Sequence, residues 1–101
     1  MRKKVDSYLG FAAKSRNLVS GYHTCLHAIR QRKLKLLILS EDLSENTVQK
    51  LSKYSAENGI PFRRYGKTEE LSRITGNQER GVFGVTDGSF ADAILKEIDG
   101  E

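Results

Sequence analysis

GYHTCLHAIRQRKLKLLILS, residues 21–40, is the stretch that decides the fold of this 101-residue chain. It opens on a glycine, continues as an amphipathic helix with basic residues, and runs with almost no linker into the apolar segment 36–39. A helix joined so closely to a buried strand indicates an α/β unit. Gly21 lets another backbone approach the first helical turn, whose amide groups would then face an anion such as phosphate. The stretch therefore predicts a helix N-terminus that is presented to a polyanion.

The distribution of charge supports this interpretation. Residues 1–35 contain nine basic side chains and one acidic side chain, a balance of +8, whereas residues 36–101 carry a balance of −4. The net charge of +4 conceals this asymmetry. Charge runs often do no more than solvate helix faces. Here the glycine turn lies beside the charge, and the combination favours a nucleic acid or another anionic partner.

Helices alternate with extended segments along the whole chain. Periodicity and capping residues predict helices over residues 4–15, 22–33, 45–58, 69–75 and 89–98. Extended segments are predicted at 18–19, 36–39, 60–65 and 82–86. Ser44 and Thr68 are the predicted N-caps of the third and fourth helices, and Gly59 and Gly76 follow their ends. The pattern predicts an α/β sheet with helices on both faces, formed by a single domain over residues 1–101.

The chain has one cysteine, Cys25, so an intrachain disulfide is excluded and a reducing compartment, the cytoplasm, is expected. No apolar run approaches the roughly 20 residues that a membrane span needs. The N-terminal segment 1–15 is interrupted by polar residues, so it is expected to be an amphipathic helix and not a signal peptide. We therefore predict no membrane partner.

Few residues suggest catalysis or metal binding. His23 and His27 lie four residues apart on one helix face, but no third ligand has helpful spacing, so no metal site is predicted. The pair Glu41-Asp42 follows a strand, where α/β proteins often bind ligands, but an acidic turn that leads to Ser44 is the favoured interpretation. Cys25 is expected in the core. Without a nucleophile or nucleotide-binding motif, the chain is predicted to have no cofactor and not to be an enzyme.

The segment GNQERGVFGV, residues 76–85, has two interpretations that remain open at this point. Its three glycines surround Glu79-Arg80 and the apolar pair Val82-Phe83. Such a loop could lie against nucleobases, with Arg80 reaching a phosphate or a base edge. It could equally be a glycine-rich turn into a strand, with Phe83 in the core.

Three parts of the chain together resemble a known family. These are KSRNLVSGYHTCLHAIRQRKLKLLILSEDLSENT, NGIPFRRYGKTEELSRITG and ERGVFGVTD, and the resemblance extends over roughly residues 9–95. The chain resembles the small kink-turn RNA-binding ribosomal protein superfamily, in particular its bacterial YlxQ-like branch. The resemblance implies a three-layer α/β/α sandwich around a four-stranded mixed sheet. It also implies one RNA-binding face, made by the helix after the glycine turn and by the loop before the last strand.

The resemblance also implies a set of RNA-binding residues. Gly21 matches the turn glycine of the family. Many members have an Asn-Glu pair and then a lysine where this chain has His23, Thr24 and His27. This departure changes the donors and acceptors that could read bases. The remaining residues implied by position lie on the RNA-clamping loop or approach the RNA backbone, and they are Lys33, Lys67, Glu79, Arg80, Gly81 and Val82. Arg16 is also expected to lie near a phosphate of the RNA.

The predicted function is that of a non-catalytic RNA-binding protein of the ribosomal or ribosome-associated kind. Its expected partner is a structured, kink-turn-like RNA, either ribosomal RNA or an mRNA leader. One alternative is a protein-interaction module on the same fold that has lost RNA binding together with the Asn-Glu pair. Another is a substrate-recognition partner of an RNA methyltransferase.

Overall fold

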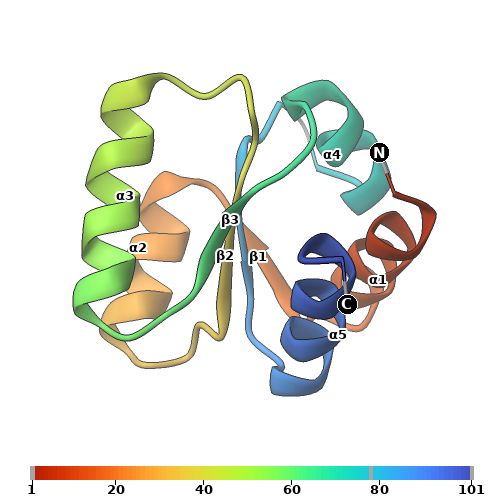
Figure 1. Cartoon of the computed structure of the whole chain (residues 1–101), viewed down its shortest axis with the longest axis horizontal. Coiled ribbons are helices and arrows are strands. Elements are labelled where there is room, and N and C mark those ends of the chain that lie inside the picture. The colour runs from red at the N-terminus through yellow and green to blue at the C-terminus, as the bar shows by residue number, and fades with distance from the viewer. Residues whose placement is uncertain (1, 78, 101) are drawn as a thin grey trace.

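The computed structural model of the chain describes residues 2–77 and 79–100. Helices and strands alternate, as Figure 1 shows. The helices are α1 (Lys3–Lys14), α2 (Tyr22–Arg30), α3 (Glu45–Glu57), α4 (Thr68–Thr75) and α5 (Gly88–Ile98). The strands are β1 (Leu18–Ser20), β2 (Leu36–Leu39), β3 (Phe62–Arg64) and β4 (Val82–Val85).

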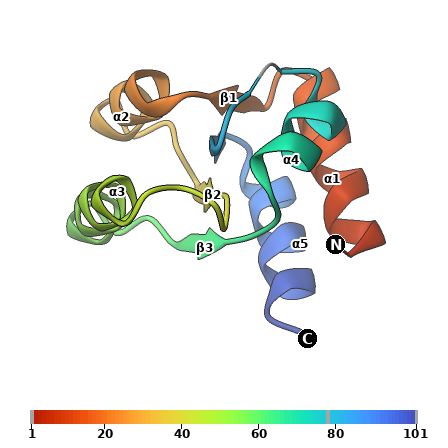
Figure 2. The same cartoon turned by 90° about the horizontal axis from the view of Figure 1, so that it is seen from above.

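The four strands form one mixed sheet in the order β1-β4-β2-β3. Strand β4 is antiparallel to both β1 and β2, whereas β2 and β3 are parallel, so β1, β2 and β3 run in the same direction. Helices α2 and α3 cover one face of the sheet, and α1, α4 and α5 cover the other (Figures 1 and 2). This arrangement confirms the predicted three-layer α/β/α sandwich around a four-stranded mixed sheet.

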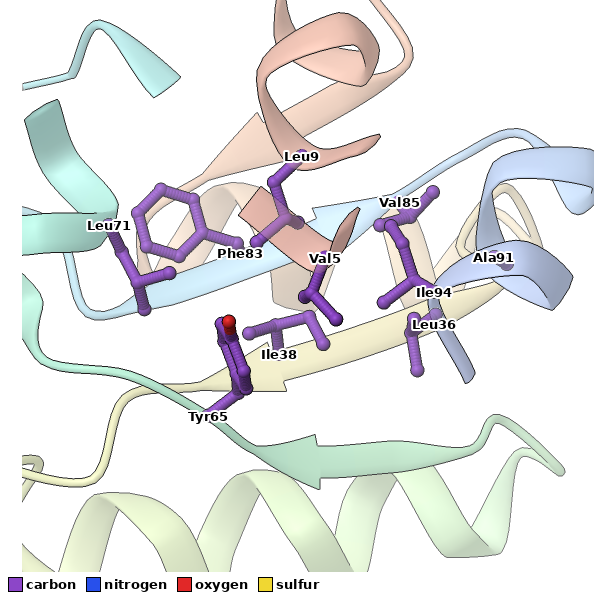
Figure 3. Packing of buried hydrophobic residues seen from close by; sticks show 10 residues of the cluster. All are labelled: Val5, Leu9, Leu36, Ile38, Tyr65, Leu71, Phe83, Val85, Ala91 and Ile94. Atoms are coloured by element: carbon purple, nitrogen blue, oxygen red, sulfur yellow. The ribbon is translucent and has the colours of Figure 1, made fainter. Parts of the chain in front are cut away.

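Strand β2 divides the core into two clusters. Its four residues are fully buried, and side chains alternate across a strand. Leu36 and Ile38 belong to the cluster under α1, α4 and α5, which Figure 3 shows, whereas Leu37 and Leu39 belong to the cluster under α2 and α3. A strand that is covered on both faces must be apolar throughout, and this confirms the interpretation of residues 36–39.

Helix α2 is shorter than predicted, because it ends at Arg30 and not at residue 33. The N–H of Lys33 donates to the carbonyl of Ala28 at 2.9 Å, and the N–H of Arg32 donates to that of Ile29 at 3.0 Å. This pair of bonds is a Schellman motif, which usually places a glycine in the left-handed position. Here Arg32, and not a glycine, takes that position with φ 58°. The residue type therefore did not mark the end of the helix.

Helix α1 ends in the same way. The N–H of Asn17 donates to the carbonyl of Ala12 at 2.7 Å, and Arg16 adopts φ 63°. Arg16 thus occupies the left-handed position that turns the chain from α1 into β1.

Strand β3 is also shorter than the predicted 60–65, since its ladder covers only Phe62–Arg64. No helix in the described part of the chain is long and apolar enough to cross a membrane.

Candidate nucleic-acid interface

Four connections meet at one end of the sheet. Because β1, β2 and β3 run in the same direction and β4 runs against them, the ends of the first three strands lie beside the start of the fourth. The segments that meet there include Gly21, Ser40–Asp42, Gly66–Lys67 and Glu79–Gly81. Helices α2 and α4 also begin at this end. The topology therefore brings the glycine turn and the loop before β4 together, although 59 residues separate Gly21 from Arg80.

Gly21 joins β1 to α2 in a conformation that favours glycine. Its φ is 99° and its ψ is 152°, a region that other residues rarely occupy. Its N–H donates to the carbonyl of Val82 at 2.8 Å, which ties the start of α2 to the start of β4. A Cβ on Gly21 would lie 3.4 Å from Nη1 of Arg80 and 3.9 Å from the hydroxyl of Thr24. The Arg80 guanidinium therefore lies directly beside the first turn of α2.

The buried hydroxyl of Ser72 holds Arg80 in place. The N–H of Arg80 donates to Oγ of Ser72 at 2.8 Å, and that hydroxyl donates to the Arg80 carbonyl at 3.1 Å. The same loop is tied to β1, because Oγ of Ser20 donates to the side-chain oxygen of Asn77 at 3.0 Å. Two serines therefore fix both ends of the connection between α4 and β4.

Substitution of Ser72 by alanine is expected to lower the free energy of unfolding by about 1 kcal/mol, because both of its hydrogen bonds are lost. Ser52 on α3 provides a matched control. Its hydroxyl is buried and has no hydrogen-bond partner among the described residues, so Ser52→Ala should be neutral or stabilising. Urea unfolding of the two variants checks the difference. Equal effects at the two serines would show that the Ser72 bonds do not hold the loop.

A polar network at the start of α4 supports the other side of the loop. The carboxylate of Asp42 accepts bonds from the N–H of Thr68 at 3.1 Å and from its hydroxyl at 2.8 Å. Ser40 and Thr68 join their hydroxyls at 3.0 Å, and a Cβ on Gly81 would lie 2.7 Å from Oγ of Ser40. Only glycine fits at position 81 without displacing this network.

This network shows that the prediction of Thr68 as the N-cap of α4 is wrong, and it explains the role of Asp42. Lys67 takes the N-cap position of α4, and Thr68 is the first helical residue, so Thr68 is not the cap. The capping acceptor is Asp42, 26 residues earlier in the chain. Sequence periodicity cannot detect such a cap, since the two residues meet only through the parallel pairing of β2 and β3. Asp42 therefore has a structural role, but this role is to cap α4 and not only to lead the chain to Ser44.

Hydrogen bonds from the hydroxyls of Thr68 and then Ser40 lower the pKa of the Asp42 carboxyl from 3.8 to about 2. A lowered folded-state pKa contributes stability that is present above pH 3.8 and is lost as the pH falls through about 2. We therefore expect Asp42→Ala to lower the melting temperature at neutral pH, and the difference from the parent to shrink between pH 4 and pH 2. Asp92→Ala, at an exposed position on α5, is the control. A pH-independent effect of Asp42→Ala would contradict the assignment.

The other predicted site residues differ in their exposure and in their position along the sheet. His23, Thr24 and His27 are exposed on α2, and Glu79 and Lys67 are exposed at the same end of the sheet as Gly21. Val82 is different, because its side chain is only 4% exposed and packs in the core cluster under α2 and α3. Its contribution to the site is its carbonyl, which accepts the bond from Gly21.

Arg16 and Lys33 lie apart from the predicted site residues around Gly21. Arg16 precedes β1 and Lys33 precedes β2, so both lie at the opposite end of the sheet from Gly21. The nine residues of α2 alone span about 13 Å between the two ends. The structure therefore brings together Gly21, Thr24 and Arg80, with His23, Lys67, Glu79 and Gly81 at the same end, and it separates Arg16 and Lys33 from them.

The electrostatics of the start of α2 favour an anion. The first turn of α2 has no acidic residue and no side-chain cap within the described part of the chain. The N-terminus of a helix carries a partial positive charge, and the Arg80 guanidinium adds a full one beside Gly21. Two like charges at one place are stabilised when an anion binds between or beside them. A phosphate that reaches this point could meet both free helix amides and a guanidinium.

Other chemistry has less support in the described residues. Among residues 2–77 and 79–100, no three His, Cys, Asp or Glu side chains come close enough to hold a metal ion. Cys25 is fully buried on the inner side of α2, as predicted, and burial raises the pKa of its thiol to about 12. Such a thiol is not a reactive nucleophile.

The sequence of the chain is similar to those of known proteins. The model of the ribosomal protein L7Ae/L30e/S12e/Gadd45 family matches residues 3–94. The RNA-binding protein YlxQ of Bacillus subtilis (strain 168) is 33% identical over 91 residues, which cover 90% of this chain and 91% of that protein. The RNA-binding protein YlxQ of Enterococcus faecium is 29% identical over 99 residues, which cover 98% of this chain and 95% of that protein.

Two solved structures share the fold. One is a protein with unknown function from Bacillus halodurans C, with a TM-score of 0.93 and 34% identity over 97% of this chain and 99% of that chain. The other is a Giardia lamblia 15.5 kD RNA-binding protein, with a TM-score of 0.82 and 16% identity over 96% of this chain and 86% of that chain. The second likeness concerns the fold alone. The family match and the identities confirm the resemblance found in the sequence: the chain belongs to the ribosomal protein L7Ae/L30e/S12e/Gadd45 family, in its YlxQ-like branch.

Proposed function

We propose that this protein binds structured RNA through the start of α2 and the loop before β4. The observation that supports the proposal most strongly is the position of the Arg80 guanidinium beside Gly21, at the uncapped start of α2. The relatives named above as RNA-binding proteins support the same class of ligand. The finer proposal is a kink-turn-like RNA, which would present a sharply bent backbone to both elements at once.

Most of the affinity is expected to come from phosphate contacts. His23 and Thr24 offer an imidazole and a hydroxyl where many relatives offer an amide and a carboxylate, so base reading would differ from theirs. The free amides of α2 and the guanidinium of Arg80 would contact phosphates, and such contacts do not depend on the identity of the base. We therefore propose that the protein recognises the shape of the bent RNA backbone more than its sequence.

The direct test compares one RNA that contains a kinked internal loop with a matched, fully paired RNA. The parent protein should bind the kinked RNA more tightly in an electrophoretic mobility assay. Arg80→Gln should remove most of that preference. Lys96→Gln removes one charge from the exposed end of α5 and should leave the preference intact. If Arg80→Gln and Lys96→Gln bind the kinked RNA equally, Arg80 is not part of the interface.

The cellular RNA is proposed to be ribosomal RNA or an mRNA leader, bound without catalysis in the cytoplasm and in association with the ribosome. Crosslinking to cellular RNA followed by sequencing identifies it. Enrichment of ribosomal RNA or of leader sequences would support this proposal. Absence of any RNA crosslink would favour the protein-interaction module, and co-purification with a methyltransferase would favour the substrate-recognition partner.

A further inference from the structure

A groove of about 360 Å³ lies between α2 and α3, outside the interface described above. The two helices lie side by side on one face of the sheet in both views (Figures 1 and 2). Residues from both helices line the groove, namely Tyr22, Leu26, Arg30, Lys50, Lys53, Tyr54 and Glu57. The lining therefore includes two tyrosines, three cations and a single carboxylate.

The groove begins where the proposed RNA interface ends. Tyr22 directly follows Gly21, and its ring meets that of His23 edge to face, with ring centroids 5.2 Å apart. From Tyr22 the α2 wall continues through Leu26 to Arg30 in steps of four residues, which places the three side chains in one row along the helix. A chain that leaves the start of α2 can thus follow this row along the helix.

The charges in the groove suit an anionic occupant. Lys50 and Lys53 are exposed on α3, and neither forms an ion pair with any residue in the described part of the chain. Arg30 is held at the far end, where its Nε donates to the Tyr54 hydroxyl at 3.2 Å and its guanidinium carbon lies 6.0 Å from the centre of that ring. A row of cations with interleaved aromatic rings is typical of sites that follow a nucleic acid strand.

We infer that the groove between α2 and α3 binds a single-stranded RNA segment that continues from the structured element bound at Gly21 and Arg80. This inference rests on the proposed function. A volume of this size holds a group comparable to one small ligand, such as a nucleotide, and it is too small for a duplex. Lys50 and Lys53 bind phosphates, a base stacks on Tyr54, and Arg30 holds the Tyr54 side chain in place. The groove therefore extends the footprint of the RNA without reading its sequence.

The test uses the kinked RNA with and without a short single-stranded tail, with each end of the RNA tailed in turn. For the parent, one of the tails should tighten binding by about fivefold or more, as expected for one stacked base. The log–log salt slope should also become steeper by about 1.4, as expected for two further phosphate contacts to a single strand. The double variant Lys50→Gln/Lys53→Gln should lose the change in slope but should bind the untailed RNA as the parent does. Tyr54→Leu should lose most of the fivefold gain.

The matched control is Lys3→Gln/Lys4→Gln, which removes two charges from α1 on the other face of the sheet and should keep the full effect of the tail. Circular dichroism checks that every variant is folded. If no tail tightens binding of the parent, or if both double variants respond to the tail alike, the inference is overturned, and a protein partner becomes the better occupant.

Failure of the proposed function gives a different result. In that case the parent does not bind the kinked RNA, and a single-stranded oligonucleotide at low salt becomes the probe. Weaker binding of the oligonucleotide by Lys50→Gln/Lys53→Gln than by Lys3→Gln/Lys4→Gln would still support the groove. Equal binding by the two double variants would overturn it.

Discussion

Gly21→Val is expected to weaken RNA binding by more than tenfold, and by more than His23→Ala. Valine cannot adopt φ 99° and ψ 152° without strain, and such a conformation costs about 1–3 kcal/mol when the fold enforces it. Relief of this strain would move the start of α2 away from β4. In addition, the Cβ of valine would already lie 3.4 Å from Nη1 of Arg80, and its two methyl groups would displace the guanidinium. The change therefore damages the helix amides and the arginine together.

The matched control for this prediction is Gly88→Val at the start of α5. A Cβ there meets no atom within 4 Å, and Gly88 does not have a positive φ, so the same substitution should leave RNA binding unchanged. His23→Ala removes one side chain and leaves the amides and Arg80 in place, so its cost should be smaller. A mobility assay on the three folded variants gives the order. Parent-like binding by folded Gly21→Val would refute the proposed site.

Phe83→Ala is expected to lower the free energy of unfolding by about 3–5 kcal/mol, which is a large part of the stability of a domain of this size. Phe83 is 1% exposed and is the largest fully buried side chain among the described residues. It projects from β4 into the cluster made with α1, α4 and α5 (Figure 3). Truncation leaves a cavity that these helices cannot close without moving.

Phe11→Ala is the control for this stability prediction. Phe11 is 57% exposed on α1, so the same substitution should change the free energy of unfolding by no more than about 0.5 kcal/mol. Urea unfolding of both variants measures the contrast. A similar loss of stability at the two phenylalanines would contradict the assignment of the core.

Residues that carry their structural meaning locally were predicted well. The apolar run Leu36–Leu39 needed no context to be a buried strand, and Ser44 caps α3 through the N–H of Thr47 as predicted. The end of α2 was not predictable in this way. Arg32 occupies a left-handed position that a glycine usually marks, and arginine is a good helix former. The pattern therefore indicated helix to residue 33, whereas α2 ends at Arg30.

The candidate site shows the same division. Gly21 and the loop around Arg80 could be identified from the sequence because glycines marked both. The residues that hold them could not, since Ser72 and Asp42 act across the fold and have no local signature. Burial of Val82 and the distant placement of Arg16 and Lys33 likewise depend on strand order, which the sequence pattern alone does not contain.

The most direct test of the central proposal is an NMR titration of the ¹⁵N-labelled protein with a kinked RNA. The largest changes should occur at the amides of Tyr22, His23 and Thr24 in the first turn of α2, and at those of Arg80 and Gly81 in the loop before β4. If the resonances of these five amides do not shift while those of another surface do, or if no resonance shifts, the proposal is contradicted.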